Sequence, residues 1–210
     1  MHLSLSELNF YARRAAFATG LPWGFGTAFG GALTRLAAFG HDPAIVAAQA
    51  LTNLATGRAG RLAHTGFEQS HWAPDTPAFL SAAWVGPLVD DWLALKANSK
   101  HVLRIENADL PQLLSAYLAP CSIAVNGGPA TPAEAVLASH NSTGPACMLI
   151  EASVVKAGGR RSDSRKDGIE GVDVDAAGWA VVQEFFARCN VFSDERSRAA
   201  GAGAGLVDRD

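Results

Sequence analysis

The sequence predicts an α+β protein in which an N-terminal helical bundle is packed with a small mixed sheet and a long C-terminal helix. Three observations predict it. Residues 3–57 hold three consecutive helical patterns, residues 102–155 contain short alternating stretches, and a long amphipathic pattern follows Asp175. Because the period changes near residue 98, we divide the chain into a helical domain or subdomain, 1–98, and an α+β part with a Gly/Ala-rich C-terminal tail, 99–210.

The first helix is predicted to begin at a capping box. Ser4 and Glu7 stand three residues apart, so each side chain can bond the other's backbone N–H. Gly20 is the expected end, since glycine readily adopts the positive φ that closes a helix. The buried stripe at helical spacing is Leu5, Leu8, Ala12, Ala15 and Ala16.

The second helix is expected from Pro22 to Phe39, because proline is well suited to a first turn. Its interior holds Gly24, Gly26, Gly30 and Gly31, and each costs about 1 kcal/mol relative to alanine. So many glycines favour a close approach by another helix or a ligand over a break near Gly24. The uncharged stretch 15–34 has the length of a membrane span, but its glycines and proline argue against one.

The third helix has the clearest limits, with Asp42 as N-cap, Pro43 as first residue and Gly57 as the end. Its predicted buried face is Ile45, Val46, Ala50, Leu51 and Leu54.

The composition narrows the class of protein. In 210 residues, 49% are hydrophobic and 18% are charged, which is typical of a globular chain. A net charge of −3 gives no reason to expect nucleic-acid or anionic-membrane binding. The three cysteines are scattered, which indicates reduced thiols and a cytoplasmic location, and the low surface charge favours self-association.

The connection from Arg58 to Pro77 contains the one metal-like spacing. His64, Glu68 and His71 would share a face if this segment were helical, and two imidazoles and a carboxylate suit zinc or another divalent metal. The simpler interpretation is a polar surface loop, because Gly66 weakens the helix.

A fourth helix is predicted over 77–96, kinked at Gly86-Pro87. Its expected inner face is Phe79, Leu80, Ala83, Trp84, Leu88, Trp92 and Leu95. Beyond it, strands are expected over 102–106, 122–125 and 147–155. A helix opened by Asp109 and Pro111 and another that starts at Thr131-Pro132 lie between them.

The charged stretch 158–171 is a candidate substrate-binding loop. Arg160 and Arg161 lie in it, and arginine binds anionic groups in a bidentate manner. The simpler interpretation is a solvated loop, since mixed charge lies between glycines at both ends.

The last long helix is predicted to be capped by Asp175, and the chain ends in alternating glycine and alanine. Glu195, Arg198 and Asp208 flank this tail, where backbone N–H groups would be accessible, so we take them as candidate catalytic residues. The structural alternative is that they form ion pairs that hold the terminus in place.

Both ends of the chain resemble a bacterial family described as a conserved domain of unknown function, with members close to this length. The resemblance covers the stretches LSLSEL at 3–8, ARRAA at 12–16 and GLPWG at 20–24, and SR at 197–198 with AGAGAGL at 200–206 and Asp208. It implies a soluble, cytoplasmic bacterial protein, and the family supplies no catalytic residues. Members tend to end in Asp-Asn-Asp, whereas Arg209 stands in the middle here.

The opening also resembles the helical start of the malate and sulfolactate type dehydrogenases, which use nicotinamide cofactors outside the Rossmann fold. Those enzymes are longer and carry a catalytic histidine in a Ser-His-Gly setting. Neither His41 nor His64 has such surroundings.

We therefore expect an accessory protein, a homo-oligomer that works through a small-molecule pocket or a partner protein. The alternative is a small metabolic enzyme acting on an anionic metabolite, possibly related to the nicotinamide-dependent dehydrogenases. The sequence identifies no cofactor.

Overall fold

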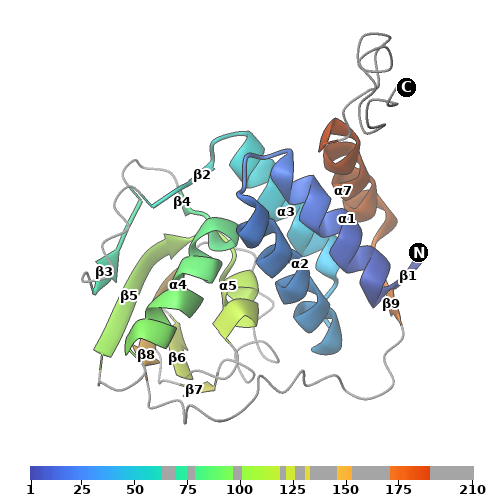
Figure 1. Ribbon diagram of the computed structural model, residues 1–210. Helices are drawn as coiled ribbons and strands as arrows, with labels where there is room; N and C mark the ends of the chain where they lie inside the picture. Colours follow the sequence, from blue (N-terminus) through green and yellow to red (C-terminus); the bar gives the residue numbers. More distant parts are fainter. Residues whose placement is uncertain are drawn as a thin grey trace, which may run out of the picture.

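The computed structural model describes residues 1–62, 70–74, 79–96, 101–118, 122–125, 131–132, 146–152 and 171–189. It is an α+β protein, as predicted (Figure 1). The helices of these ranges are α1 (Leu5–Phe17), α2 (Trp23–Ala38), α3 (Pro43–Ala55), α4 (Ala82–Lys96), α5 (Pro111–Leu118) and α7 (Ala176–Cys189). The strands are β1 (His2–Ser4), β2 (Ala59–Gly60), β3 (His71–Trp72), β4 (Phe79–Leu80), β5 (His101–Ala108), β6 (Ser122–Val125), β7 (Thr131–Pro132), β8 (Ala146–Ala152) and β9 (Gly171–Asp173).

The first three helices begin and end where the sequence predicts. Ser4 and Glu7 form the capping box of α1, and the Asp42 carboxylate accepts from the backbone N–H of Ala44 at 2.8 Å to cap α3. Gly20, Gly40 and Gly57 follow the three helices with φ of 83°, 82° and 70°. These ends depend on local geometry alone, which is why the sequence predicts them.

Two of the four glycines of α2 lie against α1. A Cβ on Gly30 would stand 2.9 Å from the backbone oxygen of Asn9, and a Cβ on Gly26 would overlap the ring of Phe17. Gly24 and Gly31 have nothing within 4 Å of such a Cβ. The prediction of close helix packing is therefore confirmed at Gly26 and Gly30 only.

The larger sheet has the strand order β2-β4-β5-β8-β6-β7, and β3 also pairs with β5. β2, β4, β3 and β5 pair in parallel, whereas β5, β8, β6 and β7 pair antiparallel. A second small sheet joins β1 to β9, which are 167 residues apart from Ser4 to Gly171 along the chain. Figure 1 shows the larger sheet on one side, α1, α2, α3 and α7 on the other, and α4 and α5 between them.

One continuous core joins the two parts of the chain. α7 packs against α1 and α3, and α5 packs against α2. The largest buried side chains of this core include Trp72, Trp92, Trp179 and Phe29. The helix α7 therefore rests on the N-terminal helices although it follows the sheet in sequence.

The sequence was wrong about several boundaries. The helix predicted over 77–96 begins only at Ala82, because Phe79 and Leu80 form β4 and pair with β2. Thr131 and Pro132 do not start a helix but form β7 against β6. The connection from Arg58 contains the short strands β2 and β3.

Two apolar residues assigned to buried faces are exposed. Leu95, expected on the inner face of the fourth helix, is 68% exposed, and Ile45, expected on the buried face of α3, is 46% exposed. Its neighbours Ala44 and Val46 are both buried, so Ile45 lies outside the face that α3 turns towards the core.

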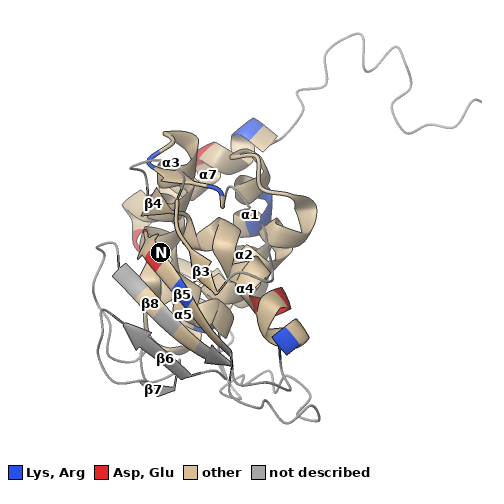
Figure 2. Cartoon of the chain, turned by 90° about the vertical axis from the view of Figure 1, so that its left-hand side faces the viewer, with Lys and Arg blue, Asp and Glu red and all other residues tan. Residues whose placement is uncertain are grey.

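The charged residues of the described helices and strands lie in small separate groups of both signs (Figure 2). None of the helices in these ranges combines the length and the apolarity that a membrane crossing needs.

Candidate functional site

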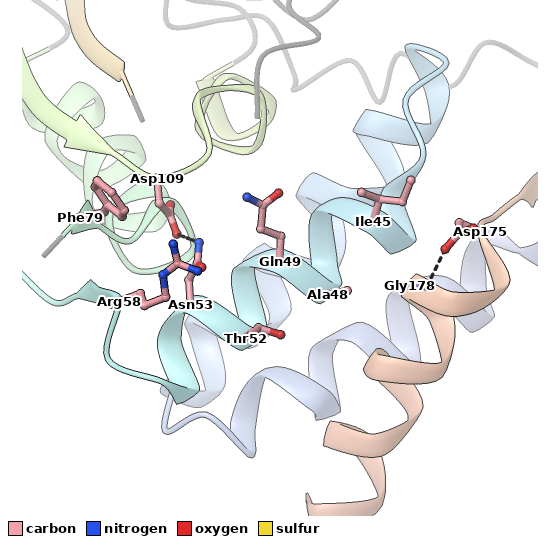
Figure 3. Close-up of a pocket in the computed structure, with 10 residues that line it drawn as sticks. All are labelled: Ile45, Ala48, Gln49, Thr52, Asn53, Arg58, Phe79, Asp109, Asp175 and Gly178. Carbon is pink, nitrogen blue, oxygen red and sulfur yellow. Dashed lines mark hydrogen bonds between the residues drawn. The ribbon is translucent and has the colours of Figure 1, made fainter. Parts of the chain in front are cut away.

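A pocket of about 490 Å³ lies along the outer face of α3, a volume within the range of small-molecule sites. Its lining residues come from four places that are distant in the sequence: α3, the start of the β2–β4 pair, the end of β5 and the start of α7. They are Ile45, Ala48, Gln49, Thr52, Asn53, Arg58, Phe79, Asp109, Asp175 and Gly178 (Figure 3).

The floor of the pocket is one face of α3. Its residues Ile45, Ala48, Gln49, Thr52 and Asn53 follow the spacing i, i+3, i+4, i+7 and i+8, so they form a single stripe. Since α-helices rise about 1.5 Å per residue, the eight steps from Ile45 to Asn53 give a floor about 12 Å long. The stripe passes from an apolar residue to polar ones.

Asp109 and Asn53 form the buried polar end of the pocket. Asp109 is 3% exposed and Asn53 is 8% exposed, and the Asn53 side-chain amide donates to Asp109 Oδ2 at 3.1 Å. The backbone N–H of Ala82 donates to Asp109 Oδ1 at 2.8 Å. The Asp109 carboxylate therefore satisfies the first backbone N–H of α4, whereas the sequence led us to expect it at the start of α5.

Burial raises the pKa of the Asp109 carboxyl above its ordinary value, because a charge is costly where water is excluded. The hydrogen bonds from Ala82 and Asn53 act in the opposite direction but do not outweigh burial. A carboxyl group with a raised pKa beside a pocket is a feature that functional sites share.

Arg58 supplies the positive charge at this end. It is exposed, and it lines the pocket together with Asn53 and Asp109 (Figure 3). Its backbone carbonyl accepts from the N–H of Phe79 at 2.9 Å, which holds these two residues next to each other. Within the described parts of the chain, no ion pair joins the Arg58 guanidinium to a carboxylate.

The opposite end is closed by the start of α7. A Cβ on Gly178 would lie 3.0 Å from the backbone of Ala44 and Ile45, so the absence of a side chain at this position favours the close approach of α7 to α3. Asp175 caps α7, since its Oδ2 accepts from Gly178 N–H at 2.7 Å. Its own N–H donates to Asp42 Oδ2 at 2.6 Å, and this bond ties α7 to the N-terminus of α3.

Most of the predicted site residues lie outside the described residues: Arg160, Arg161, Glu195, Arg198, Asp208, His64 and Glu68. Their assignments stay predictions. His71 is described, and it lies in β3 rather than on a helix. Its Nε2 is 3.2 Å from Glu106 Oε1, and Arg104 contacts the same oxygen at 2.8 Å. No cluster of three or more metal-ligating side chains occurs within the described ranges.

Sequence reasoning missed the α3 pocket. A signal was present, because Gln49, Thr52 and Asn53 place polar groups on one side of a helix otherwise made of alanine and aliphatic residues. Arg58 and Asp109 gave none, since only the fold brings them to that face.

No family model matches the sequence, and no curated protein or solved structure matches it either. The resemblance at the two ends of the chain therefore stays a prediction. What the fold and the pocket define is a class, an α+β protein with a polar and apolar pocket of small-molecule size.

Proposed function

We propose that the protein binds a small molecule in the α3 pocket and acts as an accessory, non-catalytic protein. The observation that carries this proposal is that a buried carboxyl, Asp109, and an exposed guanidinium, Arg58, both line one pocket of about 490 Å³. Pockets that combine apolar walls with a few polar groups in fixed positions are the usual form of small-molecule sites.

The expected self-association belongs to the same proposal. Trp23 is 64% exposed, stacks on Phe17 at 4.7 Å and carries Arg13 over its ring. Phe10, on α1, is also exposed. Exposed aromatic side chains are typical of protein contacts. We therefore propose a contact between copies, or with a partner protein, at Trp23 and Phe10, and we call this region the α1–α2 surface.

The enzymatic alternative has one observation in its favour. A carboxyl with a raised pKa, as Asp109 has, is suited to general acid catalysis, and Arg58 suits an anionic metabolite. Yet Asp109 already receives hydrogen bonds from Ala82 and Asn53, and these account for its position without any reaction. We therefore prefer binding.

Native mass spectrometry of the purified protein tests the proposal. We expect a retained small molecule on the wild type, and its loss in Ile45→Trp, where the indole fills the pocket. Leu95→Trp is the matched control, because Leu95 is also an exposed apolar residue of a helix but lies away from the pocket. An equal adduct on Ile45→Trp and the wild type would place the molecule elsewhere.

The same spectra report the assembly state, and a monomer at all protein concentrations would end the homo-oligomer part of the proposal. A partner protein would then be the remaining occupant of the α1–α2 surface.

A further inference from the structure

The two ends of the α3 pocket carry opposite charges. Arg58 lies at the end formed by Asn53, Asp109 and Phe79, and Asp175 lies at the end formed by Ile45 and Gly178 (Figure 3). Between them the floor offers Ala48, Gln49 and Thr52. The floor alone spans about 12 Å, the rise of eight helical residues.

At the first end the charge available to a ligand is positive. Both oxygens of Asp109 already accept hydrogen bonds, and the side chain is buried, so it presents little exposed charge to a ligand. Arg58 is exposed and, among the described residues, forms no ion pair. Arginine is the side chain best suited to a carboxylate, which it binds through two parallel hydrogen bonds.

At the second end the available charge is negative. Asp175 Oδ2 accepts from Gly178 N–H, and the side chain is otherwise open to water. Asp42 lies directly behind it, because its Oδ2 accepts from the N–H of Asp175. This end repels a second anionic group and attracts an ammonium group.

Apolar surface for the chain of a ligand comes from residues near both ends of the pocket as well as from Ala48 in the floor. Ile45 is the one exposed large aliphatic residue of α3, and its side chain lines the pocket together with Ala48 and Phe79. Burying this surface under a ligand contributes to binding in proportion to the apolar area removed from water.

We propose that the ligand of this pocket is an elongated amino acid of the ω-amino type, with its carboxylate on Arg58, its methylene chain along α3 and its ammonium group at Asp175. This inference rests on the proposed function, because it names the ligand class of the same pocket. It depends on the charge at each end as well as on the existence of the pocket.

Calorimetric titration with three six-carbon probes tests the class. The probes are 6-aminohexanoate, hexanoate and adipate, which share a carboxylate and a methylene chain and differ only at the far end. We expect 6-aminohexanoate to bind about fivefold or more tightly than adipate, with hexanoate between them, as an exposed charge pair predicts. Adipate binding as tightly as 6-aminohexanoate would overturn the proposal.

Two variants test which residue binds each end of the ligand. Arg58→Gln is expected to weaken all three probes about tenfold or more, whereas Arg61→Gln, a matched control whose guanidinium lies over Trp84, leaves them unchanged. Asp175→Asn keeps an oxygen to cap α7 but removes the charge, so it should abolish the preference for 6-aminohexanoate over adipate. An unchanged preference in Asp175→Asn would contradict the assignment of that end.

The outcomes separate the two proposals. If none of the probes binds while native mass spectra still show a molecule that Ile45→Trp removes, the ligand class is wrong and the pocket remains a binding site. If no probe binds and Ile45→Trp changes nothing, both proposals fail. Circular dichroism of each variant confirms that its helices are intact.

Discussion

The contact between α1 and α2 and the outer face of α3 are built from similar residues, but the first is closely packed and the second forms a pocket. Both are rich in alanine and small side chains. At α1–α2, Gly26 and Gly30 let the backbones meet and leave no space. On α3, polar side chains stand at positions 49, 52 and 53, and the segments around them close only the ends of the groove. Small residues that meet across a helix contact therefore leave no pocket, whereas the face of α3 that carries polar residues stays open between its closed ends.

The largest effect is expected from Asp109→Ala, which removes the carboxylate from the buried polar end of the α3 pocket. The variant loses the acceptor for Ala82 N–H and leaves the buried Asn53 amide without its partner. We expect a loss of about 3 kcal/mol in the free energy of unfolding, the sum of a lost helix cap and an unsatisfied buried donor. Urea denaturation measures it, and a loss below about 1 kcal/mol would show that water replaces the carboxylate.

The pH dependence of stability tests the burial of the Asp109 carboxyl in a second way. Since burial raises the pKa of Asp109 above the ordinary 3.8, the folded protein holds this proton more tightly than the unfolded chain. The resulting stabilisation is complete below the unfolded pKa and is lost as pH rises through the raised folded pKa. Asp109→Asn cannot ionise at this position. Its unfolding free energy should therefore rise relative to that of the wild type as the pH increases from the unfolded pKa of Asp109 through the raised folded pKa. Parallel pH profiles for the two proteins would contradict a raised pKa.

A smaller effect is expected where the α1–α2 contact is overfilled. In Gly30→Ala the added Cβ meets the backbone of Asn9 at 2.9 Å, and the helices must separate. We expect a loss of about 2 kcal/mol, the usual cost of overpacking, even after the gain in helix propensity. Gly31→Ala is the control, because it has open space and should gain about 0.5–1 kcal/mol. Thermal unfolding compares them, and equal midpoints would mean that the contact is loose.

The smallest effects distinguish the two faces of α3. Val46 is 6% exposed and Ile45 is 46% exposed, although they are adjacent. Val46→Ala should cost about 1.5 kcal/mol from lost burial and the cavity left behind, while Ile45→Ala should stay within about 0.5 kcal/mol. Chemical denaturation of both variants decides this, and an equal cost would show that Ile45 is part of the core.

The sequence predicted what local geometry determines and missed what depends on partners. Ser4, Asp42 and Gly20 mark helix ends by their own hydrogen bonds or backbone conformation, so the boundaries of α1 and α3 were readable. Strands of two residues such as β2 and β4 have no pattern of their own and exist because they pair with each other.

The candidate site was missed for a related reason. Arg58 and Asp109 are 51 positions apart by number and meet α3 only through the pairing of β2, β4 and β5. Ile45 shows how accurately a buried helix face can be predicted, because helical periodicity gives the direction of that face only to within about one residue. The residues that the sequence suggested, such as Arg160 and Asp208, lie outside the described part of the chain, so their roles stay predictions.

The most direct test of a binding site on the open face of α3 is amide NMR of the full chain during titration with 6-aminohexanoate. We expect shifts that cluster at Ala48, Gln49, Thr52, Asn53, Arg58 and Gly178, with the amide signals of Gly26 and Gly30 unchanged. Shifts that gather on the α1–α2 surface would contradict a site on α3, and no shifts at saturating concentration would contradict the proposed ligand class.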